Sequence, residues 1–149
     1  MRLEITRKSE LALRAVRELA GAPESRKGEA LAAAIGTTPS FLAQALTPLV
    51  RARWLRSDPG PRGGYRLARP ADELSVLELI EAIEGPTANG RCVLSRGDCA
   101  EVTRSGAPCA LHDAWTTARV SLLGALARQP ALRGSRRRTS SRRTTDRER

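Results

Sequence analysis

Histidine, cysteine and aromatic residues are scarce in this sequence of 149 residues. The aromatic residues are Phe41, Trp54, Tyr65 and Trp115, the one histidine is His112, and the cysteines are Cys92, Cys99 and Cys109. With so few aromatic rings, the core must be built mainly from leucine, alanine, valine and isoleucine, and the length suffices for one such core. Three cysteines cannot all pair within one chain, so we expect reduced thiols and a cytoplasmic location.

Long apolar runs are also missing, as are the motifs of common enzymes. No apolar signal region follows Met1 and no run is long enough to cross a bilayer, so we expect no membrane partner. A glycine-rich phosphate loop and a nucleophile-base pair are absent as well. We therefore expect no enzymatic activity and no small-molecule substrate.

Positive charge is plentiful but unevenly distributed. The formal net charge is +10, and residues 133–149 contain eight arginines against Asp146 and Glu148, which is +6 of that total. A basic balance favours a polyanionic partner such as DNA. Residues 131–149 have no apolar period, so we expect a disordered, Arg-rich tail that either adds salt-sensitive DNA affinity or only aids solubility.

The first half of the chain has the pattern of a helix-turn-helix. Apolar residues recur at helical spacing over 9–20, 27–35 and 39–50. Gly36 suits a left-handed cap, Thr38 an N-cap and Pro39 a first helical position. The third helix leaves Ser40, Ala43, Gln44 and Thr47 facing outward, where polar side chains can bond base edges in a major groove. An ordinary helical hairpin would give the same periodicities.

A strand pair follows and favours the DNA-binding interpretation. Residues 54–57 and 64–67 alternate like strands around a tip rich in proline and glycine that includes Arg62. A hairpin at this place is typical of a wing, whose arginine enters the minor groove. We expect Thr38, Ser40, Phe41, Gln44 and Arg62 to contact DNA.

Two further helices are predicted after Pro70. Ser75 and Glu78 form a capping box before an apolar helix that ends at Gly85. Another helix is predicted from Pro108, with an apolar stripe for which little protein remains as cover: Leu111, Trp115, Ala118, Leu122 and Leu126. Such a stripe favours a dimer seam, and we expect a homodimer.

The stretch between these helices contains every cysteine and the histidine. Cys92, Cys99, Cys109 and His112 follow one another with loop residues between them. Thiolates and imidazole bind zinc, and cysteine with an occasional histidine binds iron-sulfur clusters. The sequence therefore predicts a metal site between a DNA reader and a dimer seam.

Several motifs together resemble the iron-sulfur winged-helix regulators typified by IscR and NsrR, over about residues 1–128. The resemblance rests on the three cysteines and on Leu11-Ala12-Leu13, Thr38-Pro39-Ser40-Phe41-Leu42, Gly63-Gly64-Tyr65-Arg66-Leu67, Ser75-Val76 and Ile80-Glu81-Ala82-Ile83-Glu84-Gly85. It implies a homodimeric transcription factor whose cluster state changes its binding to operator DNA. Arg53 stands where this family tends to have glycine, which predicts strain before the hairpin, and Pro48 predicts a bend in the third helix.

The resemblance also implies the cofactor and its ligands. Cys92, Cys99 and Cys109 match the cluster-holding cysteines. His112 matches the fourth ligand of a 2Fe-2S cluster, which we favour, while Glu10 is the rival, matching members that supply a carboxylate from the other subunit to a 4Fe-4S cluster. The signal would be nitric oxide, redox state or cluster supply, and the regulator would act as a repressor. A structural zinc ion and a metal-free thiol switch remain alternatives.

The expected fold is mainly α with a small β hairpin, comprising a winged helix-turn-helix domain and a long C-terminal dimerisation helix. We place the DNA-binding domain at 1–86, the cysteine-bearing sensor loop at 87–108, the dimerisation helix at 109–130 and the tail at 131–149. Ligation in the loop is expected to set the angle between the dimerisation helix and the two readers.

Overall fold

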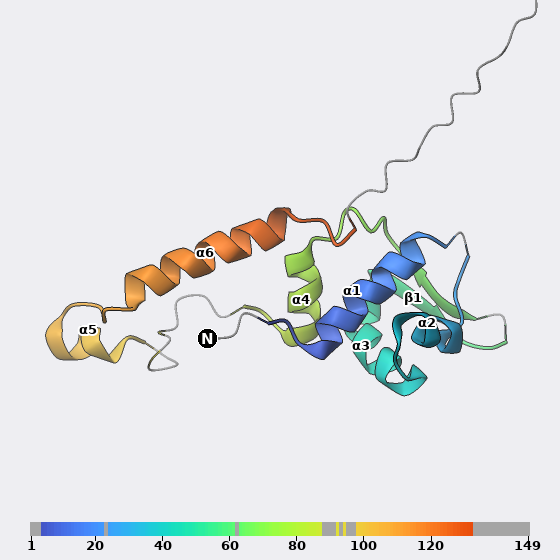
Figure 1. The fold of residues 1–149 in the computed structure, drawn as a ribbon, viewed down its shortest axis with the longest axis horizontal. Helices are drawn as coiled ribbons and strands as arrows, with labels where there is room; N and C mark the ends of the chain where they lie inside the picture. Colours follow the sequence, from blue (N-terminus) through green and yellow to red (C-terminus); the bar gives the residue numbers. More distant parts are fainter. Residues whose placement is uncertain are drawn as a thin grey trace, which may run out of the picture.

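The computed structural model describes residues 4–22, 24–61, 63–87, 92, 94 and 98–132. Within them lie six helices and one two-stranded sheet, and Figure 1 shows their arrangement. The elements in chain order are α1 (Arg7–Ala20), α2 (Gly28–Ile35), α3 (Pro39–Arg51), β1 (Leu55–Asp58), β2 (Gly64–Leu67), α4 (Val76–Glu84), α5 (Ala100–Ser105) and α6 (His112–Arg128). The expected mainly helical class with one hairpin is confirmed.

Local signals in the sequence set the bounds of the first three helices. Thr6 caps α1 by accepting a hydrogen bond from the Ser9 N–H. Gly36 ends α2 in the left-handed conformation, at φ 72°, as its position predicted. Thr38 caps α3 through the Phe41 N–H, and Pro39 opens the helix. Pro48 does not end α3, which continues to Arg51.

The hairpin is fixed to the helices by its backbone. β1 and β2 pair antiparallel with Leu55 opposite Leu67 and Asp58 opposite Gly64. Tyr65 on β2 also pairs with Arg26, just before α2, through two backbone hydrogen bonds of 2.8 and 2.9 Å. Because of this pairing, the wing is held in a fixed position beside the helix-turn-helix.

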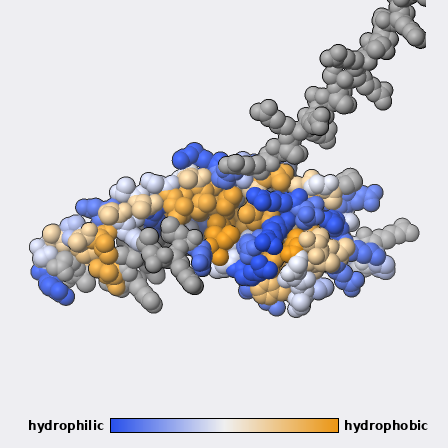
Figure 2. Space-filling view, in the orientation of Figure 1, coloured by the Kyte–Doolittle hydropathy of each residue, from blue (hydrophilic) through white to orange (hydrophobic). Residues whose placement is uncertain are grey.

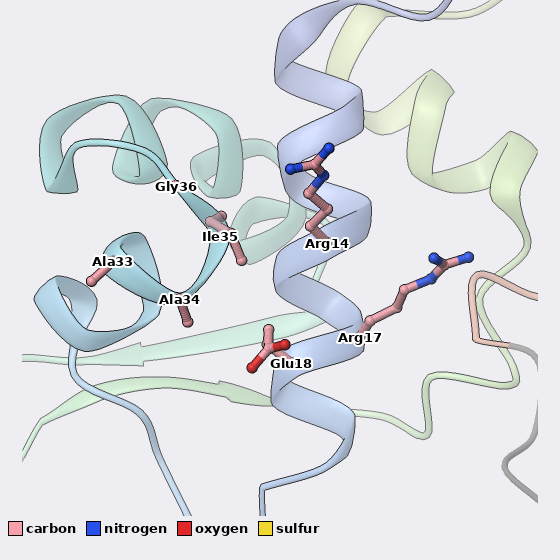
Figure 3. Close-up of a pocket in the computed structure, with 7 residues that line it drawn as sticks. All are labelled: Arg14, Arg17, Glu18, Ala33, Ala34, Ile35 and Gly36. Atoms are coloured by element: carbon pink, nitrogen blue, oxygen red, sulfur yellow. The ribbon is translucent and has the colours of Figure 1, made fainter.

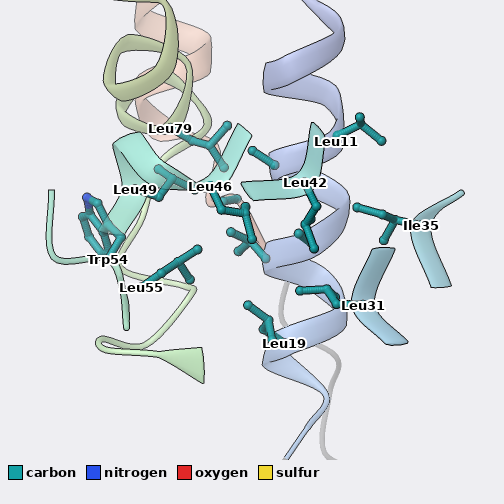
Figure 4. Close-up of a cluster of buried hydrophobic side chains, with 14 of the residues drawn as sticks. Leu11, Leu19, Leu31, Ile35, Leu42, Leu46, Leu49, Trp54, Leu55 and Leu79 are labelled. Atoms are coloured by element: carbon teal, nitrogen blue, oxygen red, sulfur yellow. The ribbon is translucent and has the colours of Figure 1, made fainter. Parts of the chain in front are cut away.

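The core lies among α1, α2, α3, β1 and α4 (Figure 4). As the composition required, its largest fully buried side chains are mostly leucines, namely Leu11, Leu31, Leu42, Leu46, Leu49, Leu55, Leu74 and Leu79. Trp54 is the one aromatic ring among the buried core residues. The predicted capping box of α4 is present, with Ser75 and Glu78 bonded reciprocally. The Ser75 N–H and hydroxyl lower the pKa of Glu78.

The C-terminal part differs from the prediction in three ways. The last long helix begins at His112 rather than at Pro108, and a short helix, α5, lies in the expected loop. Gly106 ends α5 in the left-handed conformation, at φ 72°, so no single helix spans this stretch. Beyond α6, Ala131 is buried and Leu132 packs against the core, although both were assigned to the tail. Residues 133–149 lie outside the described residues.

α6 joins the rest of the molecule mainly at its C-terminal end. The Ala131 N–H donates to the Leu74 carbonyl oxygen (2.6 Å), and the Val76 N–H donates to the Gln129 carbonyl oxygen (2.8 Å). From there α6 runs away from α2, α3 and the hairpin, and α5 lies at the far end of the molecule (Figure 1). No helix in the described ranges has both the length and the apolar character needed to cross a bilayer.

Candidate metal centre and nucleic-acid interface

The three cysteines come from different local structures but meet at one place. Cys92 lies in the connection after α4, Cys99 immediately precedes α5, and Cys109 lies three residues before α6. Cys92 and Cys99 are buried and Cys109 is half-buried. The short helix α5 and the turn after it bring the chain back on itself, which returns Cys109 to the two earlier thiols.

The sulfur atoms form a compact group. All three lie within 4.8 Å of one another, and the Cys92 and Cys109 sulfurs are 3.8 Å apart. The Cys109 N–H also donates to the Cys99 sulfur at 3.4 Å. Burial, together with the neighbouring thiols, raises the pKa of Cys109. Sequence reasoning predicted this grouping, and its chemistry is that of a site for a thiophilic metal ion or cluster.

His112 lies next to this group without belonging to it. It is the first residue of α6, and its backbone N–H donates to the Cys109 carbonyl oxygen at 2.9 Å. That turn ties His112 to a cysteine by the backbone alone, and the close group consists of the three thiols. Its role as fourth ligand stays a prediction.

Glu10, the rival fourth ligand, is engaged elsewhere in its own subunit. Its two carboxylate oxygens contact Arg7 and Arg14, each at 2.6 Å. A hydrogen bond from Arg7 and the charge of Arg14 lower the pKa of Glu10. Metal binding by Glu10 would compete with these two arginines, and its role also stays a prediction.

Trp115 is placed one helical turn after His112. The sequence assigned it to an apolar seam, and it is half-buried. Its indole nitrogen is buried and has no hydrogen-bond partner among the described residues. A buried N–H donor without an acceptor costs stability, so this end of α6 leaves one polar group unsatisfied beside the cysteine segment.

The predicted DNA-contacting residues lie on and before α3, apart from one in the wing. Ser40, Gln44 and Thr38 are exposed, and the Thr38 hydroxyl accepts the capping hydrogen bond from the Phe41 N–H. Phe41 packs partly against the core and leaves part of its ring at the surface. Arg62 lies outside the described residues. These roles remain predictions.

Sequence reasoning overlooked one exposed residue of α3 and one acidic residue of α4. Arg51 continues the exposed positions of Ser40, Gln44 and Thr47 at spacings of four, three and four, a signal that the sequence already contained. Glu84 of α4 accepts hydrogen bonds from the Thr6 N–H, the Thr6 hydroxyl and the buried Ser9 hydroxyl. Burial raises the pKa of Glu84, but the hydrogen bonds from Ser9 and Thr6 outweigh this and lower it.

Comparison with known proteins identifies the family. Residues 5–130 match the model of the Rrf2 family, described as an iron-dependent transcriptional regulator. A helix-turn-helix transcriptional regulator of Mycobacterium tuberculosis is 39% identical over 126 residues, which cover 83% of this chain and 76% of that protein.

Solved structures share the fold at lower identity. CymR, the global cysteine regulator of B. subtilis, superposes with a TM-score of 0.67 at 21% identity, covering 87% of this chain and 94% of CymR. The T. potens IscR structure gives a TM-score of 0.63 at 21% identity, covering 87% and 83%. Helix-turn-helix, wing and cysteine group thus occur in one chain whose family regulates transcription and performs no enzymatic reaction. The protein belongs to the Rrf2 family of helix-turn-helix transcriptional regulators.

Proposed function

We propose that this protein is a homodimeric repressor whose binding to operator DNA is controlled by an iron-sulfur cluster held by Cys92, Cys99 and Cys109. The observation that carries the proposal is the meeting of all three thiols within 4.8 Å, at the end of the molecule remote from the wing. Thiolates are the ligands of iron-sulfur clusters, and the burial of two of them limits solvent access. The donor set therefore fits the group. When bound, a cluster supplies one-electron redox chemistry and with it sensitivity to nitric oxide, redox state or cluster supply.

His112 is the preferred fourth ligand. Its position three residues after Cys109, within one backbone turn, places its backbone next to the cysteine segment. Imidazole is an established cluster ligand, as in Rieske centres. Glu10 is less suitable because two guanidinium groups already occupy both of its oxygens. Three thiolates and one imidazole favour a 2Fe-2S cluster over a 4Fe-4S cluster.

The connection of the cysteine segment to the DNA reader supports control of operator binding. The segment starts at the end of α4, where the Thr87 N–H donates to Glu81 at 3.0 Å, and it leads into α6, which returns to the start of α4 at Leu74 and Val76. The residue that precedes the cysteine segment and the residues that follow α6 are therefore both hydrogen-bonded at or next to α4. α4 packs on α1 and α3 and is tied to the start of α1 by Glu84. A conformational change in the cysteine segment is therefore transmitted through α4 to α3, the helix predicted to read DNA bases.

A second copy of the chain is the proposed partner of α6. α6 has no buried residue, and Val120 is 65% exposed. Apolar residues gather over α6 and α4 in Figure 2, where a groove of about 540 Å³ is lined by Leu77, Val120, Leu123 and their neighbours. Pairing of two such faces would remove this surface from water. It would also set the spacing of the two α3 helices, which must match half-sites about 34 Å apart.

A single zinc ion is a second candidate for the same thiols. A tetrahedral ion bound about 2.3 Å from each thiolate holds the sulfurs about 3.8 Å apart, which is the separation of the Cys92 and Cys109 sulfurs. Zinc would act as a fixed brace without redox chemistry. The same pair is also close enough for a metal-free thiol switch after oxidation.

The test is operator binding at fixed salt. An operator is first selected from random duplexes by the protein itself. Fluorescence anisotropy then measures the operator affinity of anaerobically loaded protein and of metal-free protein. Control by the cluster predicts different affinities, and Cys99→Ser should bind equally in both preparations. His112→Ala should lose the difference. Glu10→Ala should keep it, as should the matched variant Thr117→Ala, because Thr117 is exposed on α6 and does not line the groove. Equal affinity of loaded and metal-free wild-type protein would contradict the proposed control and leave DNA binding intact.

A further inference from the structure

Three exposed arginines lie around the junction between α3 and β1. Arg51 ends α3, Arg53 lies in the following turn and Arg56 lies on β1, and all three are exposed. None of them forms an ion pair within the described ranges, whereas nearby Arg66 and Arg69 contact Asp58 and Glu73 at 3.3 and 3.2 Å. We call Arg51, Arg53 and Arg56 the basic ledge.

The basic ledge borders a groove. The last turn of α3, the turn after it and strand β1 enclose about 620 Å³, with Val50 and Leu55 among the lining residues. The guanidinium of Arg69 lies 4.0 Å from the centre of the Trp54 ring, and it holds one wall in place. Arg53 and Arg56 are thus presented on a fixed surface rather than on a loose loop.

Two features of the basic ledge reduce the stability of the fold. Arg53 has φ 61°, in the left-handed region, which is strained for a residue other than glycine. Arg56 lies directly opposite Arg66 in the hairpin, and like charges in that register repel. In the part of the chain that the structure describes, neither Arg53 nor Arg56 has an acidic partner. An external polyanion would offset both costs.

The basic ledge continues the predicted DNA-reading surface. The exposed residues Ser40, Gln44, Thr47 and Arg51 form one stripe along α3. The eleven rises of 1.5 Å from Ser40 to Arg51 span about 16.5 Å, which exceeds the width of about 12 Å of the major groove. If the start of the stripe reads bases, its far end passes the groove wall and meets a phosphate strand.

We propose that the basic ledge binds DNA phosphates beside the bases read by the first turns of α3, and that it supplies affinity without sequence preference. This inference rests on the proposed binding of operator DNA. Phosphate contacts position a protein on the duplex and release counterions, so they determine how strongly affinity depends on salt. DNA is favoured over an acidic protein because the ledge and the reading stripe share Arg51 and form one surface.

The experiment measures binding of the full chain to its selected operator and to a scrambled duplex between 50 and 300 mM KCl. Arg53→Gln combined with Arg56→Gln removes two charges from the basic ledge. Lys8→Gln combined with Arg17→Gln is the matched control, because both are exposed cations of α1 that form no ion pair in the described part of the chain. Figure 3 shows Arg17 extending from the side of α1 away from α2. Far-UV circular dichroism confirms that both variants fold.

The ledge variant should lower the slope of log affinity against log salt by about 1.8, since each phosphate contact contributes about 0.9. Its affinity for both duplexes should fall by the same factor, and the control should keep the wild-type slope. An unchanged slope, or a loss confined to the operator, would overturn the proposal and leave the regulator function standing. A wild-type protein that binds neither duplex would overturn both.

Discussion

Replacing Gly64 by alanine is expected to detach the wing from the helix-turn-helix. Gly64 opens β2 at φ 153°, a conformation that residues with a side chain rarely adopt. A Cβ there would lie 2.7 Å from the carbonyl carbon of Arg26 and closer still to its oxygen. These are backbone atoms, so the collision is relieved only if the strand or the segment before α2 moves.

The expected cost follows from what that movement breaks. Backbone strain of this kind costs about 1–3 kcal/mol. The pairing of Arg26 with Tyr65 contains two backbone hydrogen bonds of 2.8 and 2.9 Å, and each is worth about 0.5–1.5 kcal/mol. Gly64→Ala should therefore lower the free energy of unfolding by about 2–6 kcal/mol, a large part of the roughly 5–15 kcal/mol typical of a domain.

Gly60→Ala is the matched control because Gly60 also has a positive φ, 95°, but has open space where a Cβ would lie. It should cost only the conformational strain, about 1–2 kcal/mol. Urea unfolding followed by far-UV circular dichroism gives both values. If Gly64→Ala destabilises the protein no more than Gly60→Ala does, the Arg26–Tyr65 pairing does not fix the wing and the reasoning is refuted.

Three further predictions use the same unfolding assay. Arg53→Gly should raise the free energy of unfolding by about 0.5–1 kcal/mol, because release of left-handed strain exceeds the conformational entropy that glycine loses; a destabilised variant would contradict this. Ser9→Ala should lower it by about 1–2 kcal/mol, since the fully buried Ser9 hydroxyl donates to a carboxylate; an unchanged value would show that this bond contributes nothing. Because the folded pKa of Glu84 is below its ordinary 4.5, Glu84 stabilises the fold above that pH, and the contribution is lost as pH falls through the folded pKa. Glu84→Gln should flatten the acid-induced loss of stability below pH 4.5, and an unaltered pH profile would count against this role.

The elements of the N-terminal domain were predictable because their signals are local. Gly36, Thr38, Pro39 and the capping box at Ser75 each act within a few residues, and each is found where the sequence placed it. Strain at Arg53 was predicted from the family pattern and is present as a left-handed backbone. The grouping of the three cysteines was also predicted, since they are the chain's only thiols.

The features that were missed depend on contacts distant in sequence. Glu84 lies 75 residues from Ser9, so no periodicity relates the two. Ala131 and Leu132 lie in a polar C-terminal composition and were assigned to the tail, but the Ala131 N–H reaches Leu74 and places both against the core.

The central claim is that Cys92, Cys99 and Cys109 hold an iron-sulfur cluster. The most direct test is an anaerobic visible absorption spectrum of freshly purified protein, with iron, sulfide and zinc assayed on the same sample. A thiolate-bound cluster predicts visible absorption with iron and sulfide in proportion, both lost in Cys92→Ser. A colourless protein containing zinc, or no metal, would contradict the cluster and leave the DNA-reading fold with a different switch.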